Sequence, residues 1–165
     1  CGSRMKEYHH LLRHDKEYSE KARRFGETVR DIHELLVELP FQPPTATLDY
    51  RVTYQDSCHL SNAQRITEQP RQILKSIPGI DFVELTNADK CCGAGGTYTI
   101  TEREFSLRVL DAKMDATRDS NADVVATANP GCVLQIQYGV SREGLPTKVC
   151  YVIDLLDEAY GLEEI

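Results

Sequence analysis

The sequence predicts an α/β fold in which a small, mainly parallel sheet is flanked by helices and preceded by an N-terminal helical arm. Two observations carry this prediction. After residue 48, short strand-like segments alternate with helical ones, and strands that are separated by helices pair in parallel with both faces covered. Before residue 40, apolar residues instead recur at intervals of three and four, the spacing of one helix face.

The arm is predicted to be helical over residues 6–39. From Tyr18 onward its apolar positions share one helix face, and they are Tyr18, Ala22, Phe25, Val29, Ile32 and Leu36. His14-Asp15 separates an earlier short helix, and Gly26 is a candidate break. Three prolines over residues 40–47 predict a linker. We therefore expect a helical segment over residues 1–39, a linker over residues 40–47 and an α/β domain over residues 48–165.

Within the domain we expect strands over residues 50–54, 81–85, 124–127 and 148–153. Helices are expected over residues 69–76, after residue 101, over residues 130–138 and after residue 154. Thr101 and Glu104 match a capping box at a helix start, and Asp154 is a candidate N-cap. The buried stripe of the helix after residue 101 is expected to be Phe105, Val109, Ala112 and Ala116.

Composition and charge argue against a membrane-spanning, a secreted or a nucleic-acid-binding protein. A chain of 165 residues is long enough for one domain with a hydrophobic core. No apolar run approaches the ~20 residues that span a bilayer, and charged residues and histidines occupy the N-terminus where a signal peptide is apolar. The net charge of −7 argues against nucleic acid as a partner. We therefore expect a cytoplasmic protein.

Four of the six cysteines follow predicted strands or open predicted helices. Cys58 follows the first strand, Cys91 and Cys92 follow the second, and Cys132 follows the third. Because the carboxyl ends of parallel strands gather at one edge of a sheet, thiols that are distant in sequence can converge there. Cys150 lies within a predicted strand and is expected to be a small core residue.

The string Cys91-Cys92-Gly93-Ala94-Gly95-Gly96 is the most specific feature of the sequence. Successive side chains of an extended segment point to opposite sides, so the backbone must turn sharply if both sulfurs are to face one centre. Gly93 provides that freedom, because glycine readily adopts positive φ. Gly95 and Gly96 add a segment of little bulk, whose N–H groups could donate to the sulfurs of an anionic cluster.

Four thiolates suit either tetrahedral zinc or a [4Fe–4S] cluster. Structural zinc sites use paired cysteines two to four residues apart, and the sequence contains no Cys-x-x-Cys. Adjacent ligands fit a cluster better, since a cluster offers separate irons to neighbouring sulfurs. We expect an iron–sulfur cluster held by Cys58, Cys91, Cys92 and Cys132, with zinc as the alternative. His59, next to Cys58, is a candidate hydrogen-bond donor to a cluster sulfur or a structural histidine.

These residues resemble the cysteine-rich CCG-domain family, which includes the iron–sulfur subunit of glycolate oxidase, a lactate-utilisation protein and the B subunit of heterodisulfide reductase. The resemblance runs from about residue 50 to the end of the chain. It is carried by the segments Asp56-Ser57-Cys58-His59-Leu60, Cys91-Cys92-Gly93-Ala94-Gly95-Gly96 and Asn129-Pro130-Gly131-Cys132. Within the family the chain looks like the glycolate oxidase branch, on the segments at residues 74–79, 82–85 and 154–160.

The resemblance implies an electron-transfer subunit of a flavin-dependent oxidase or dehydrogenase of 2-hydroxy acids such as glycolate. FAD would lie only on a flavoprotein partner, and electrons would pass from it through the cluster to an acceptor such as a quinone. The chain alone is not expected to oxidise glycolate. Any membrane association, at the inner face, would be through the complex. The alternatives are a thiol–disulfide redox subunit like heterodisulfide reductase and a zinc-stapled interaction domain.

Two further positions bear on the resemblance. Family members carry two such units in tandem, so Cys1 would be a ligand of a preceding unit and residues 1–39 a junction from it. Gln135 stands where some relatives have a fifth cysteine. This departure weighs against direct disulfide chemistry and against the non-cubane cluster of the heterodisulfide reductase branch.

Overall fold

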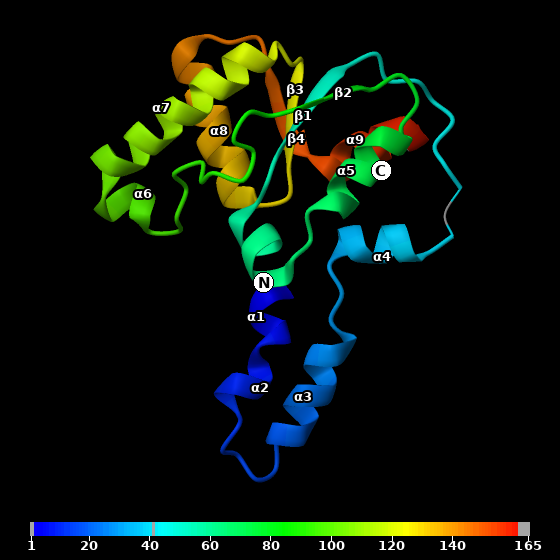
Figure 1. Ribbon diagram of the computed structural model, residues 1–165, viewed down its shortest axis with the longest axis vertical. Coiled ribbons are helices and arrows are strands. Elements are labelled where there is room, and N and C mark those ends of the chain that lie inside the picture. Colours follow the sequence, from blue (N-terminus) through cyan, green and yellow to red (C-terminus); the bar gives the residue numbers. More distant parts are fainter. Residues whose placement is uncertain (1, 41, 162–165) are drawn as a thin grey trace.

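The computed structural model describes residues 2–40 and 42–161, and Cys1 lies outside them. The domain is built on a sheet of β1 (Arg51–Gln55), β2 (Asp81–Glu84), β3 (Val124–Thr127) and β4 (Lys148–Tyr151), in the order β2-β1-β3-β4. Every pairing is parallel (Figure 1). The predicted fold class is confirmed, and β2 and β4 end earlier than predicted.

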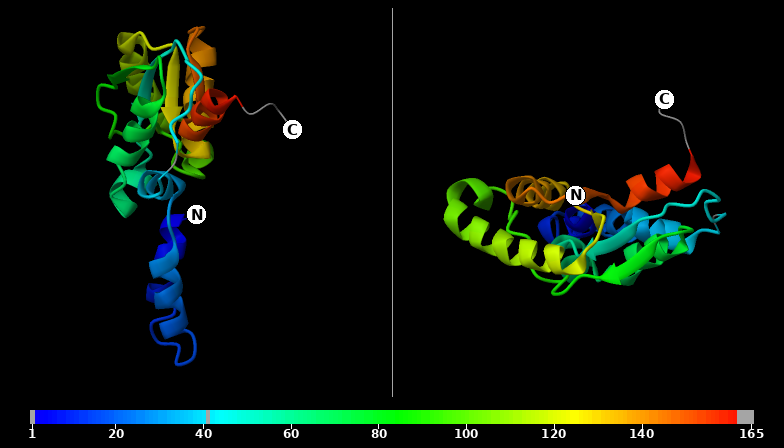
Figure 2. Two further views of the ribbon diagram at one scale, coloured as in Figure 1. Left: turned by 90° about the vertical axis from the view of Figure 1, so that its right-hand side faces the viewer. Right: turned by 90° about the horizontal axis from the view of Figure 1, so that it is seen from above.

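Helices cover both faces of the sheet. α5 (Glu68–Ser76) and α9 (Val152–Tyr160) lie together on one face, while α7 (Arg103–Ser120) and α8 (Pro130–Glu143) lie on the other. Two further views show the same layers (Figure 2). This arrangement is expected of a parallel sheet, whose crossover helices bury both faces of the strands.

Each face of the sheet has its own hydrophobic core. Beneath α5 and α9, the strand residues Val52, Tyr54 and Val124 pack against helix residues such as Leu155. On the opposite face, Val125 packs against α7 and α8. Cys150 is 5% exposed and belongs to the first core, so the expectation that it is a core residue is confirmed.

The arm is not one helix. It consists of α1 (Gly2–Lys6), α2 (Tyr8–Leu11), α3 (Ser19–Thr28) and α4 (Ile32–Glu38). The first three form a projection away from the sheet (Figures 1 and 2), and α4 packs on α5. The longer helices are interrupted over residues 12–18, which include the predicted break at His14-Asp15, and again over residues 29–31. Gly26 remains inside α3, where a Cβ would lie 2.8 Å from the carbonyl oxygen of Lys6. Glycine there permits the close approach of α1 and α3.

The predicted apolar stripe of the arm is mostly not buried. Ala22 is 6% exposed, but Tyr18 and Phe25 are 49% and 43% exposed. The Phe25 ring instead stacks on Tyr8, with 5.7 Å between ring centroids. The predicted single helix face is wrong, because Tyr18 and Val29 flank α3 and Ile32 begins a separate helix. The three short helices of the projection offer too little facing surface to cover these side chains.

Two helix starts in the domain also differ from expectation. Thr101 belongs to a short preceding helix, α6 (Tyr98–Thr101), and its hydroxyl donates to the carbonyl of Thr97, so the predicted capping box is absent. α9 begins at Val152, and Asp154 accepts a hydrogen bond from the backbone N–H of Tyr151 within the first turn. Asp154 thus stabilises the helix start from inside the helix.

The buried face of α7 is rotated from the predicted one. Phe105 is 56% exposed, whereas Leu110, Lys113 and Met114 are buried. Ala116 is buried as predicted. No helix in the described residues is both long enough and apolar enough to cross a membrane.

We predict that Leu155→Ala lowers the free energy of unfolding by about 2–5 kcal/mol, because Leu155 is fully buried in the core under α9 and its removal leaves a cavity. Urea denaturation followed by circular dichroism measures this change. The control is Leu134→Ala, since Leu134 is 68% exposed on α8 and should change stability by less than about 0.5 kcal/mol. Equal losses in both variants would contradict this packing.

Candidate metal centre

The carboxyl ends of three neighbouring strands carry the predicted thiols. β1 and β3 are paired so that Gln55 lies beside Thr127, the last residue of each strand. Cys58 follows β1, and Cys132 follows β3. β2 flanks β1 on its other side and leads into the loop that carries Cys91 and Cys92. The chain passes from β1 to β2 on one side of the sheet, and then to β3 and β4 on the other side of β1. The position between β1 and β3 is therefore a topological switch point, which is where open α/β sheets bind ligands.

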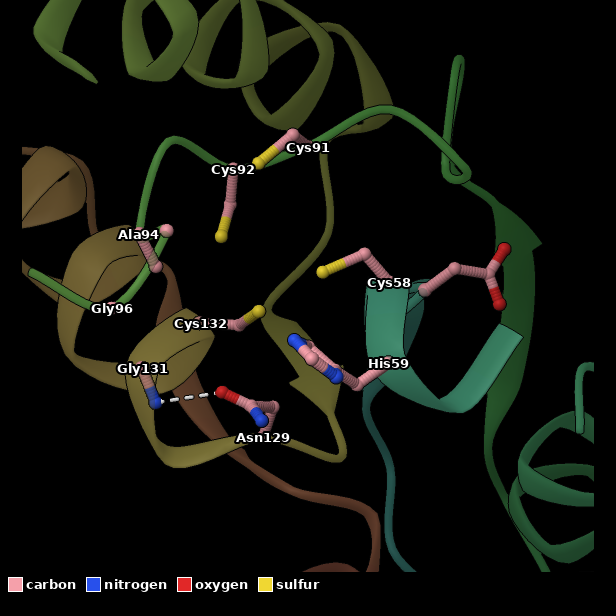
Figure 3. Close-up of a pocket in the computed structure, with 11 residues that line it drawn as sticks. Cys58, His59, Cys91, Cys92, Ala94, Gly96, Asn129, Gly131 and Cys132 are labelled. Carbon is pink, nitrogen blue, oxygen red and sulfur yellow. Dashed lines mark hydrogen bonds between the residues drawn. The ribbon is translucent and has the colours of Figure 1, made fainter. Parts of the chain in front are cut away.

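All four predicted cysteines line one cavity of about 310 Å³, together with Gly95 and Gly96. Their sulfur atoms point toward a common space from three different segments (Figure 3). Cys92 and Cys132 are buried, Cys58 is half-buried and Cys91 is exposed. The site is therefore closed on the sheet side and open to solvent at Cys91.

The loop at Gly93 turns as the sequence predicts. Gly93 has φ +90°, and a Cβ on it would lie 2.5 Å from the carbonyl oxygen of Ser106. Its N–H donates to the sulfur of Cys91, with 3.3 Å between nitrogen and sulfur. Gly95 and Gly96 also have positive φ. Gly93 itself is buried and does not line the cavity, which is lined by the two later glycines.

Two side chains on the helices behind the loop hold this turn in place. The hydroxyl of Ser106 donates to the carbonyl of Gly93 at 2.8 Å, and the Gln135 amide donates to that hydroxyl at 3.1 Å. Gln135, the position that departs from the five-cysteine pattern, therefore supports the Cys-Cys-Gly turn through Ser106. Ser106 was not identified from the sequence, since a serine in a helix carries no distinctive signal.

Cys132 lies in the first turn of α8. The Asn129 side chain caps this helix by accepting from the N–H of Gly131 at 2.9 Å, and Pro130 occupies the first helical position. The N-terminus of a helix favours negative charge. The Asn-Pro-Gly-Cys segment thus places a thiol where the backbone stabilises a thiolate or an anionic group bound to it.

His59 is exposed and lines the cavity beside Cys58 (Figure 3). It begins η1 (His59–Ala63), a single π-helical turn. Such turns occur frequently at functional sites. The imidazole therefore lies near the thiols, as the hydrogen-bonding interpretation requires.

A buried ion pair between Arg71 and Asp56, joined by the more exposed Glu84, fixes the start of the segment that carries Cys58. Both terminal guanidinium nitrogens of Arg71 donate to the Asp56 carboxylate at 2.9 Å, and Arg71 also contacts Glu84 at the end of β2. Arg71 and Asp56 are 8% and 7% exposed. Sequence patterns did not single out Arg71, because an arginine within a predicted helix is usually solvated.

Gln55 links the two cysteine loops. Its side-chain amide is fully buried and donates to the carbonyls of Asp56, Ala88 and Lys90 at 2.7, 2.9 and 3.0 Å. Asp56 precedes Cys58, and Lys90 precedes Cys91. One side chain at the end of β1 therefore sets the path of both loops. Gln55 was also missed from the sequence, where it appears only as the polar end of a strand.

The thiols influence one another. A hydrogen bond from the neighbouring Cys132 thiol lowers the pKa of Cys92 to about 6, although burial acts in the opposite direction. The same contact, together with burial, raises the pKa of Cys132. Burial raises the pKa of Cys58, and charge on Cys91 and Cys92 acts in the same direction. Four thiolates cannot coexist here without a compensating positive charge. A bound metal provides that charge, since metal binding displaces thiol protons.

The donor set fits a group larger than one ion. Within residues 2–40 and 42–161, no three His, Cys, Asp or Glu side chains converge closely enough to hold a single metal ion. The same four sulfurs nevertheless surround about 310 Å³, whereas roughly 10–15 Å³ suffices for one water. Spread thiols around a roomy cavity suit a cluster in which each sulfur has its own metal atom.

Comparison with known proteins places this architecture in a family. Residues 52–137 match the model of the cysteine-rich domain designated CCG. The chain is 47% identical to the probable glycolate oxidase iron-sulfur subunit of Bacillus subtilis (strain 168), over 98% of this chain and 37% of that protein. It is 31% identical to lactate utilization protein A of Geobacillus sp. (strain WCH70), over 95% of this chain and 66% of that protein. The chain thus spans only part of these relatives.

We predict that Gly93→Ala destabilises the metal-free protein more than Gly144→Ala, measured by urea denaturation under reducing conditions. Both glycines have positive φ, but nothing lies within 4 Å of a Cβ at Gly144. Gly144→Ala should cost about 1–2 kcal/mol from the backbone alone. Gly93→Ala should cost about 1–3 kcal/mol more, because its methyl group meets the Ser106 carbonyl. Equal costs would show that the loop at Gly93 is not packed in this way.

Proposed function

The chain belongs to the cysteine-rich CCG-domain family, and on that premise we propose that it is the cluster-binding part of an iron–sulfur electron-transfer subunit. Cys58, Cys91, Cys92 and Cys132 are the proposed ligands, with Gly93, Gly95 and Gly96 forming the adjoining backbone. The single observation that carries the proposal is the position of all four thiols around one cavity at the carboxyl edge of the sheet.

The proposed group is a [4Fe–4S] cluster, which would supply one-electron transfer. Four thiolates complete the ligand set of such a cluster, and the sequence has no further cysteine at residue 135. The Gly93 N–H, which donates to the Cys91 sulfur, stabilises negative charge on that ligand. The first turn of α8 does the same at Cys132. Hydrogen bonds of this kind and burial are how a protein sets the potential of a cluster.

We propose that a flavoprotein partner carries FAD and oxidises the substrate, a small 2-hydroxy acid such as glycolate. Oxidation of the alcohol to the oxo acid would release two electrons and two protons to the flavin, and a cluster held by these four thiolates would supply one-electron transfer from the reduced flavin toward an acceptor such as a quinone. The names of the relatives from Bacillus subtilis and Geobacillus, a glycolate oxidase subunit and a lactate utilization protein, support this substrate class. The chain alone should not oxidise glycolate.

The proposed location is the cytoplasm, with attachment to the inner face of the membrane only through the complex. Electron delivery to a membrane quinone would require such attachment. The net charge of −7 suits docking on other proteins rather than on an anionic lipid surface, which attracts basic segments.

We predict that Cys92→Ala abolishes cluster binding and that Cys150→Ala does not. The two cysteines are similarly buried, with exposed fractions of 2% and 5%. Only Cys92 lines the cavity that the four proposed ligands surround. After anaerobic reconstitution, the wild type and Cys150→Ala should contain about four irons and about four sulfides per chain and be brown. Cys92→Ala should lose most of both.

Iron, sulfide and zinc analysis of the same samples separates the alternatives. A colourless protein with about one tightly bound zinc per chain would favour the zinc-stapled interaction domain. Normal iron content in Cys92→Ala would contradict the ligand assignment. Disulfide reductase activity of the reconstituted protein would support the heterodisulfide reductase-like alternative.

A further inference from the structure

A buried lysine lies on the far side of the cysteine loop. Lys113, on α7, is 3% exposed, and lysine is almost never fully buried without a partner. It lines a second cavity, of about 430 Å³, that also includes Cys91 and Lys90. Because Cys91 lines both cavities, Lys113 stands directly behind the loop that carries the proposed ligands.

The protein gives this ammonium group very little compensation. Its Nζ donates to the carbonyl of Asn87 at 2.7 Å, which uses one of three N–H donors. Among the described residues, no carboxylate forms an ion pair with it. Burial lowers the pKa of Lys113, and the negative charge that opposes this effect most is that of Cys92, followed by Asp89 and Cys91. Cys92 and Asp89 are thus the nearest sources of negative charge to act on Lys113, and Cys91 shares a cavity with it.

We propose that Lys113 is a charge-compensating residue that raises the reduction potential of the cluster held by Cys91, Cys92 and their partners. The proposal rests on the function proposed above. An electron that enters the site adds negative charge beside four thiolates, and a buried cation makes that addition more favourable. The effect is large only because the charge is buried, where the effective dielectric constant is low.

Lys90 provides the natural comparison. It immediately precedes Cys91, yet its side chain is 70% exposed and lies 3.4 Å from the Asp89 carboxylate. Solvent and this neighbour screen its charge. Removing the same charge at Lys90 and at Lys113 therefore separates the influence of burial from that of proximity along the chain.

The test is a redox titration of the reconstituted protein, followed by electron paramagnetic resonance. Lys113→Met should lower the ratio of reduced to oxidised cluster at a fixed potential by about tenfold, equivalent to about 59 mV for a one-electron couple. Lys113→Arg retains the charge and should behave like the wild type. Lys90→Met should shift the ratio by much less. Iron and sulfide analysis confirms loading of every variant before titration.

An unchanged potential in loaded Lys113→Met would overturn the proposal while leaving the cluster assignment intact. Equal shifts in Lys90→Met and Lys113→Met would overturn it too, since burial would then not matter. Should Lys113→Met fail to load, Lys113→Gln replaces it, because its amide keeps a donor for the Asn87 carbonyl. If neither Lys113→Met nor Lys113→Gln binds the cluster while Lys113→Arg does, the charge is required for cluster binding, and the proposed effect on the potential is overturned. Absence of any cluster in the wild type would overturn both proposals.

Discussion

The parallel pairing of β1 with β3 is the constraint on which the candidate metal centre depends. Because Gln55 and Thr127 end their strands side by side, the segments that carry Cys58 and Cys132 leave the sheet at one level. β2, on the other side of β1, delivers the Cys-Cys-Gly loop to the same edge. These three segments are not joined by any local sequence motif. The distances between the thiols are therefore set by the distances between neighbouring strands.

Buried polar groups then convert a general sheet edge into a defined site. Arg71 ties the Asp56 carboxylate to Glu84 at the end of β2, and Gln55 ties together the loops before Cys58 and Cys91. Together these contacts link the ends of β1 and β2 to the segments that follow them. The Gln55 side-chain oxygen has no hydrogen-bond partner among the described residues, so this network is not fully satisfied. The hydrogen bonds that are made still restrain both loops from the scaffold side.

The sequence alone was sufficient for the fold class, the positions of the strands and the grouping of the four cysteines. These features follow from alternation of elements and from adjacency of Cys91 and Cys92, which are local signals. The sequence alone was insufficient to identify the buried face of α7, on which Lys113 lies while Phe105 is exposed. Apolar periodicity assumes that helices bury apolar residues, whereas this face meets the polar backbone of the cysteine loop. Such partners become visible only once distant segments are brought together.

The two cores of the sheet differ in their relation to the proposed ligands. The core under α5 and α9 contains none of the four, whereas Cys92 and Cys132 belong to the core on the opposite face. In a zinc finger, by contrast, the ion nucleates folding of a chain that is otherwise unstructured. Here the core under α5 and α9 rests on contacts that involve none of these four thiols. Loss of a bound group would therefore act first on the face covered by α7 and α8, where two of its proposed ligands are part of the packing.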